Sequence, residues 1–174
     1  MPKLLAFAFA FSLLGLTACD SSDVDDTFTV TAAVTGDAEL STLESAVVEA
    51  NLAAALDDMD EEYTVFAPTD AAFTAALDDL GLTPAQLLAD ANLASILQLH
   101  VVAGSELEAD DLDDGDTVTT LNGQTLTVVD VDGRLGLDTE DDDDEPNAFV
   151  TTADIEVSNG VVHKIDYVLL PADN

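Results

Sequence analysis

Basic residues are almost missing from this chain of 174 residues. Lysine and arginine together occur three times, against 37 aspartates and glutamates, which gives a formal net charge of −34 at pH 7. A surface with this charge repels phosphate backbones and anionic membranes, which argues against nucleic-acid binding. We therefore expect any charged partner to be cationic.

Cysteine occurs once, at Cys19, so a disulfide within the chain is excluded. Long hydrophobic runs are also scarce. The run from Leu4 to Leu16 follows Lys3 and is short for a membrane span, which is typical of an export signal. The segment Leu16-Thr17-Ala18-Cys19 resembles the lipobox of prokaryotic lipoproteins, in which the signal is cut before a cysteine that carries lipid.

The lipobox predicts how the chain is divided. Residues 1–18 are expected to be a signal peptide, 19–26 the lipidated Cys19 with an acidic tether, 27–171 one folded domain, and 172–174 a tail. We expect an exported protein of the cell envelope that is held on a membrane by lipid on Cys19, in either leaflet. The alternative is an ordinary secretory signal with an incidental cysteine.

The composition is that of a folded domain despite the charge. Hydrophobic residues make up 48% of the chain, and the acidic residues stand between periodically spaced apolar ones. The length suits one domain and is short for two. The acid excess fits the surface of a protein adapted to molar salt, where counterions screen the repulsion between carboxylates.

The apolar spacing changes from helical in the first half to alternating in the second, which indicates an α+β fold. Residues 27–31 fit either a strand or a helix, and the acidic run 138–145 predicts a solvated loop. The expected helices are 41–50, 52–56, 70–79, 84–89 and 93–100; the expected strands are 63–67, 118–121, 125–129, 135–137, 149–157 and 161–170, with hairpin turns at Asn122-Gly123, Asp132-Gly133 and Asn159-Gly160.

Two segments carry a family resemblance. The first is Tyr63-Thr64-Val65-Phe66-Ala67-Pro68-Thr69-Asp70-Ala71-Ala72-Phe73, and the second begins at Asn159-Gly160 and runs to Pro171. They resemble the two signatures of the fasciclin (FAS1) family of extracellular adhesion domains, in the family's order. The resemblance implies a wedge or sandwich of about seven strands with helices packed at one end, mainly from the N-terminal half. It also implies structural roles for Thr64, Phe66, Ala67, Pro68, Thr69, Phe73, His100, Asn159, Gly160, His163, Ile165 and Asp166.

Both histidines have apolar neighbours in the sequence. We interpret His100 and His163 as buried neutral imidazoles bonded to backbone, with a shared metal site as the alternative. Leu99-His100 stands where many family members carry a Tyr-His pair linked to integrin-type recognition. Because leucine replaces the tyrosine, and because the signal is prokaryotic, we do not expect integrin-type binding.

The acidic residues do not form a recognisable metal or catalytic motif. The loop Asp130-Val131-Asp132-Gly133 fails as an EF-hand, since Val128 and Thr139 stand where carboxylates are required, and it predicts a hairpin turn instead. A nucleophile elbow and a phosphate loop are both missing from the sequence. No cofactor is implied, and the acidic run could collect divalent ions only loosely.

These observations predict a non-catalytic, lipid-anchored domain that adheres to a surface protein, a glycan or matrix. The adhesive role is implied by the family resemblance alone. The alternatives are an envelope lipoprotein that binds a ligand or polysaccharide and, less favoured, a hydrolase whose paired carboxylates the sequence does not single out.

We predict that the protein is stabilised strongly by salt. In molar KCl or NaCl the Debye length falls to about 3 Å, so the repulsion among the 37 acidic residues is screened. The thermal unfolding midpoint should therefore rise steeply across a salt series. A midpoint that stays flat would contradict the salt-adapted interpretation.

Overall fold

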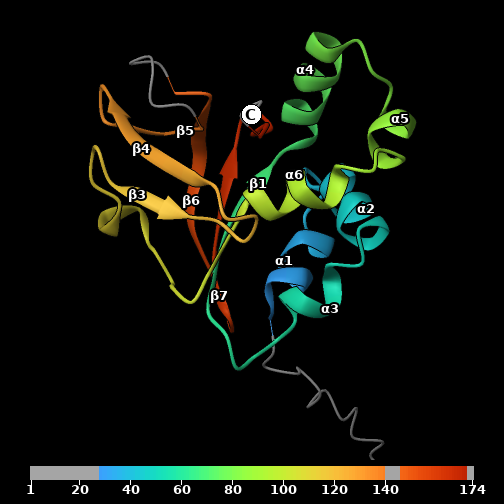
Figure 1. Cartoon of the computed structure of the whole chain (residues 1–174). Coiled ribbons are helices and arrows are strands. Elements are labelled where there is room, and N and C mark those ends of the chain that lie inside the picture. The colour runs from blue at the N-terminus through green and yellow to red at the C-terminus, as the bar shows by residue number, and fades with distance from the viewer. Residues whose placement is uncertain (1–27, 140–145, 172–174) are drawn as a thin grey trace, which may run out of the picture.

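The computed structural model describes residues 28–139 and 146–171, shown in colour in Figure 1. The predicted signal peptide, the lipidated Cys19, the tether, the tail and residues 140–145 of the acidic run lie outside these ranges and stay predictions. Within them, helices fill most of the N-terminal half and strands most of the C-terminal half. The expected α+β class is confirmed.

The helices gather beside strand β1 (Figure 1). Residues 28–31, which the sequence left open, enter a helix whose N-terminus is capped by the Thr29 side chain. Thr69 and Thr83 cap two further helices, and Gly81 ends one of them at φ 64°. The helices are α1 Val30–Gly36, α2 Ser41–Glu49, α3 Ala53–Leu56, α4 Asp70–Leu80, α5 Pro84–Leu88 and α6 Leu93–Leu99, with a 3₁₀ turn, η1, at Ala109–Asp111.

The strands form one seven-stranded sheet in the order β2-β1-β7-β6-β5-β4-β3. Neighbouring strands are antiparallel except for β1 and β7, which run parallel at the centre of the fold. The sheet curls until it is nearly closed, with β2 and β3 as its two edges. The strands are β1 Tyr63–Pro68, β2 Val101–Ala103, β3 Thr117–Thr119, β4 Thr125–Val131, β5 Arg134–Asp138, β6 Ala148–Val157 and β7 Gly160–Ile165.

Strand β1 separates two hydrophobic cores and is therefore buried on both faces. One core lies between the sheet and the helices and takes Val65 from β1 together with Phe73 and Leu97. The other fills the inside of the curled sheet and takes Phe66 from β1 together with Leu137. Because this parallel pair is covered on both sides, every residue of β1 and β7 is buried, including the polar Thr64, His163 and Lys164.

Three turn predictions fare differently. Asp132-Gly133 is a two-residue hairpin turn with both residues at positive φ, as expected. Leu121 to Gly123 form a three-residue loop closed by Thr120 and Gln124, one residue longer than predicted. The prediction for Asn159-Gly160 is wrong: the loop is Ser158-Asn159, and Gly160 is already the first residue of β7.

Two expected boundaries are also wrong. Asp138 does not lie in a solvated loop but ends β5, where it is only 2% exposed. Strand β7 stops at Ile165 instead of reaching Leu170, because Asp166 turns back and bonds to the backbone of Phe149. The chain then leaves the sheet and buries Leu169 in the inner core.

Gly160 is required where β7 meets β1. A Cβ atom placed on Gly160 would lie 1.8 Å from the carbonyl oxygen of Tyr63, and its φ of 144° is one that L residues rarely adopt. Next to it, the backbone N–H of Tyr63 donates to the carbonyl of Asn159 at 3.0 Å. The parallel strands can approach this closely only because residue 160 lacks a side chain.

We predict that Gly160→Ala destabilises the protein by roughly 2 kcal/mol or more, since it adds both backbone strain and a clash with β1. Chemical denaturation in molar salt measures the loss. Gly123→Ala is the matched control: its φ is 85°, but nothing lies within 4 Å of the added Cβ. An equal cost for both variants would show that the contact with Tyr63 contributes nothing.

Candidate interaction site

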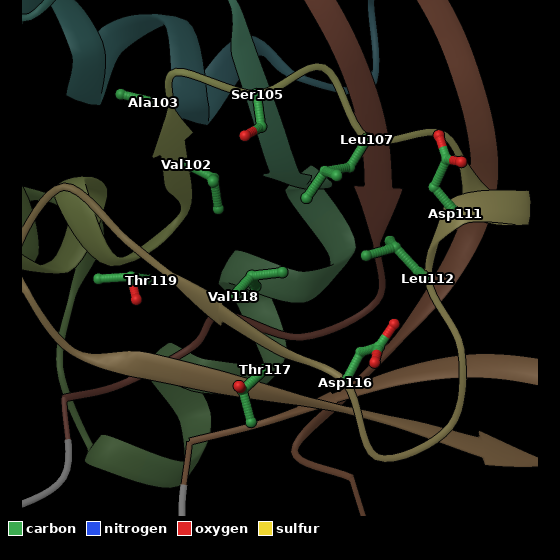
Figure 2. Close-up of a pocket in the computed structure, with 10 residues that line it drawn as sticks. All are labelled: Val102, Ala103, Ser105, Leu107, Asp111, Leu112, Asp116, Thr117, Val118 and Thr119. Carbon is green, nitrogen blue, oxygen red and sulfur yellow. The ribbon is translucent and has the colours of Figure 1, made fainter.

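A pocket of about 460 Å³ opens between the two edge strands of the sheet. At one end of the seam the edges meet, where the N–H of Leu121 donates to the carbonyl of Val101 at 2.8 Å. Beyond that bond the edges separate, and the segment between β2 and β3 runs around the pocket and forms one of its walls (Figure 2). The pocket is lined by Val102, Ala103, Ser105, Leu107, Asp111, Leu112, Asp116, Thr117, Val118 and Thr119.

The floor of the pocket is apolar and its rim is acidic. The side chains of Leu107, Leu112 and Val118 point toward one another in Figure 2, and the last two are buried. Asp111 and Asp116 stand at the rim, exposed to solvent. Each uses a carboxylate oxygen to accept a backbone N–H within its own turn. The pocket therefore combines a hydrophobic surface with a negative border.

Residues of both signatures hold one wall of this pocket. The Thr64 hydroxyl donates to the carbonyl of Ser105 at 2.9 Å and accepts the N–H of Leu107 at 2.9 Å. His163 Nε2 bonds the carbonyl of Leu107 at 2.8 Å. Thr64 comes from β1 and His163 from β7, so the central parallel pair sets the position of residues 105–107.

His163 also reaches β6. Its Nδ1 accepts the backbone N–H of Asp154 at 3.2 Å, which leaves Nε2–H to donate to Leu107 and defines a neutral ring. Burial lowers the pKa of His163, and its ring stacks on Phe66 with centroids 5.6 Å apart. Asp154, at φ 56° in an irregularity of β6, accepts the N–H of Ala109 and so holds η1 as well.

His100 joins α6 to the C-terminal segment. Its Nδ1 bonds the carbonyl of Ile96 at 2.7 Å, and its Nε2 accepts the N–H of Leu169 at 2.9 Å. Burial lowers the pKa of His100 to about 4, so the ring is neutral at physiological pH. Leu99 beside it is fully buried in the inner core. The Leu99-His100 pair is thus enclosed rather than presented to a partner.

Neither histidine ring has a nitrogen that is free to bind a metal ion. In both rings each nitrogen already bonds a backbone group. In residues 28–139 and 146–171, no three His, Cys, Asp or Glu side chains are grouped so that they could hold an ion.

Over the same ranges, no helix has the length and hydrophobicity needed to cross a membrane.

Asn159 ties the last hairpin to the helices. Its buried side chain accepts the N–H of Val30 at 2.9 Å and donates to the carbonyls of Leu56 at 2.7 Å and Asp58 at 3.2 Å. A hydrogen bond network with no unsatisfied member can specify one arrangement of these segments.

The other signature residues are placed by the core or by local bonds. Phe66 and Ile165 lie in the core inside the curled sheet, and Ala67 and Phe73 lie in the core between the sheet and the helices. Thr69 caps α4, and Pro68 pairs with Ile165 at the end of the parallel ladder. None of these residues lines the pocket.

Sequence reasoning missed the residues that form the pocket itself. The alternation Thr117-Val118-Thr119, exposed, buried and exposed, is the signal that marks an edge strand with one wet face. Nothing in the sequence shows that this edge faces β2. Lys164 was missed too: it lies almost buried in β7 and bonds Asp37 and Glu39, whose hydrogen bonds raise its pKa.

One acidic group has a perturbed pKa close to the pocket. Partial desolvation and repulsion from Asp154, Glu156 and Asp111 raise the pKa of Glu108. Glu108 is nevertheless exposed and is not among the lining residues. The raised pKa of Glu108 therefore belongs to an exposed carboxylate beside other carboxylates and does not mark a carboxylate held in a cleft.

Comparison with known proteins identifies the class. The nearly closed, mixed seven-stranded sheet with helices beside it superposes on a FAS1 domain pair from the insect cell adhesion molecule Fasciclin I, with a TM-score of 0.68 at 22% identity over 82% of this chain and 50% of the other. A family model described as the Fasciclin domain matches residues 38–171. The chain belongs to the fasciclin family, as the two signatures predicted.

Curated relatives agree with this assignment. The Synechocystis protein sll1483 is 36% identical over 149 residues, which are 84% of this chain and 76% of the relative. The cell surface glycolipoprotein MPB83 of Mycobacterium bovis is 40% identical over 112 residues, which are 63% of this chain and 44% of the relative.

We predict that His100 makes stability depend on pH. Its pKa is about 4 in the folded protein and 6.5 in the unfolded chain, so the unfolded chain binds the extra proton between these values. The contribution of His100 to the free energy of unfolding should be fully present above pH 6.5. It should fall by up to about 1.4 kcal/mol per pH unit as the pH drops toward 4.

His100→Ala tests this assignment. At neutral pH the variant should lose roughly 1–3 kcal/mol, because Leu169 N–H loses its acceptor and a cavity opens. Below pH 6.5 its stability should fall less steeply than that of the parent protein. Denaturation curves across this pH range, in the same molar salt, compare the two slopes. Parallel slopes would assign the acid sensitivity to the carboxylates.

Proposed function

We propose that this protein is a non-catalytic adhesion module, anchored by lipid on Cys19, that binds a protein or glycan at the cell surface or in the matrix. Membership of the fasciclin family carries the proposal. Among the relatives, MPB83 is named a cell surface glycolipoprotein, and the superposed domain pair comes from a cell adhesion molecule.

Features of this chain support both parts of the proposal. The lipobox ends at the single cysteine, and a short acidic segment separates that cysteine from the folded domain, as expected for a domain anchored by lipid. The pocket between β2 and β3 provides a concave surface whose apolar floor can bind a partner in molar salt, where exposed charges are screened. Contacts of this kind need no chemical turnover.

A second candidate is an envelope lipoprotein that binds a small ligand or polysaccharide. The pocket itself favours it, because about 460 Å³ lies within the range of small-molecule sites. Native mass spectrometry of the purified protein separates the two: a retained ligand of defined mass favours the second candidate.

Attachment assays in molar salt test the proposal. Three strains are compared: one with the parent protein, one with Cys19→Ser, and one with the anchor but without Val30–Leu170. We predict that Cys19→Ser releases the protein from membranes, and that both altered strains attach or aggregate less than the parent strain.

Each arm can fail separately. Cys19→Ser protein that stays membrane-bound would overturn the lipid anchor. Unchanged attachment by the strain without the domain would overturn the adhesive role. Hydrolysis of a glycan or ester panel by the purified protein would move the function to the enzyme class.

A further inference from the structure

The outer edge of β2 has backbone groups that point into the pocket. Backbone bonds on either side of β2 join His100 to Phe66 in β1 and Gly104 to Glu62 just before β1. Because an antiparallel ladder alternates, Val102 also directs its N–H and C=O toward β1. Val101 and Ala103 therefore turn their N–H and C=O away from β1. Val101 uses its carbonyl to accept Leu121, which leaves Ala103 as the outward position beside the pocket.

The outer edge of β3 has the same property. Backbone bonds on either side of β3 join Asp116 to Val128 in β4 and Thr120 to Gln124 just before β4. By the same alternation, Val118 directs its N–H and C=O toward β4. Thr117 and Thr119 turn their N–H and C=O toward the seam, and both line the pocket. Two sheet edges thus present outward backbone groups to one opening.

The bond between Leu121 and Val101 relates the two edges to each other. Leu121 follows β3 and, like Thr117 and Thr119, directs its N–H away from β4; Val101 in β2 directs its C=O away from β1, and the two groups bond. One step along from that bond, the next outward residues are Thr119 and Ala103, so the edges run antiparallel and diverge. The pocket is the space created by this divergence (Figure 2).

We propose that an extended, basic segment of a partner protein binds in this opening by adding a strand to the edges of β2 and β3. Main-chain hydrogen bonds to an exposed sheet edge give such a segment its affinity, and alternate side chains give specificity. In this site the apolar side chains of the bound segment would pack on Leu107, Leu112 and Val118, and its basic side chains would reach the acidic rim. This inference rests on the proposed function and names the chemistry of the partner.

The charge of the site selects a basic segment. The rim carries Asp111 and Asp116, and the ten described residues that line the pocket include neither lysine nor arginine. The lining also offers no aromatic ring on which a sugar could stack. A peptide with alternating apolar and basic residues complements the apolar floor, the acidic rim and the unused backbone groups together.

The test uses the purified full chain and a defined probe. The probe is an acetylated and amidated hexapeptide that alternates valine and lysine, titrated in molar KCl to screen nonspecific capture by the acidic surface. A second peptide of the same sequence carries N-methyl groups on alternate backbone nitrogens, which keeps the charge but blocks strand pairing. We expect the N-methylated peptide to bind at least about tenfold more weakly.

A matched pair of variants locates the binding edge. Thr119→Pro removes an outward N–H and leaves the bonds of β3 to β4 intact, since proline is tolerated on sheet edges. It should weaken binding at least about tenfold, whereas Thr119→Val, which keeps the N–H, should bind like the parent protein. Amide shifts of Ala103 and Thr119 on titration of the parent protein give a readout that does not depend on a variant folding.

Asp111→Asn combined with Asp116→Asn tests the rim. In a titration at lower KCl, where the exposed rim charges are less screened, the double variant should bind the peptide more weakly, by about threefold to tenfold, with a melting midpoint at least as high as the parent's. Equal binding of both peptides, or amide shifts away from the seam, would overturn the inference. So would tight binding of a neutral polysaccharide that displaces the peptide.

The two proposals fail in different ways. If the peptide does not bind but removal of the domain still reduces attachment, the strand-addition site is wrong and the adhesive role stands. If the peptide binds at the seam but removal of the domain leaves attachment unchanged, the site stands and the adhesive role is wrong.

Discussion

The close contact between β1 and β7 is the constraint on which the rest of the structure depends. Gly160 lies against the carbonyl of Tyr63, too close for any side chain at residue 160. From this contact the parallel ladder runs to Pro68 and Ile165, between the two cores. At the same corner Asn159 binds the first helix and the turn before β1. Helices and sheet are thus joined at the start of one strand.

The same pair of strands positions the candidate site. Thr64 on β1 and His163 on β7 bind the backbone of residues 105–107, which form a wall of the pocket. A buried neutral histidine is well suited to this role, since one nitrogen donates and the other accepts. Thr64 and His163 therefore set the position of one pocket wall without lining the pocket themselves.

The two basic residues that the structure describes, Lys164 and Arg134, both contact other side chains of the domain. Lys164 pairs with Asp37 and Glu39, and it is almost buried. Arg134 lies over the Phe149 ring at 4.2 Å and close to Asp166, whose carboxylate also accepts the Phe149 N–H. The acidic surface of the described domain is therefore left to solvent and counterions, which gives a physical reason to expect dependence on salt.

The amino-acid sequence by itself determined the α+β order, the turn at Asp132-Gly133 and the fasciclin family, because each of these depends on residues close together in the chain. It misplaced the turn at Asn159-Gly160, since glycine there serves a contact with a strand far away in the sequence. It also gave no sign of the pocket. Only the tertiary structure decided that β2 and β3 face each other, because their seam depends on how far the whole sheet curls before its edges meet.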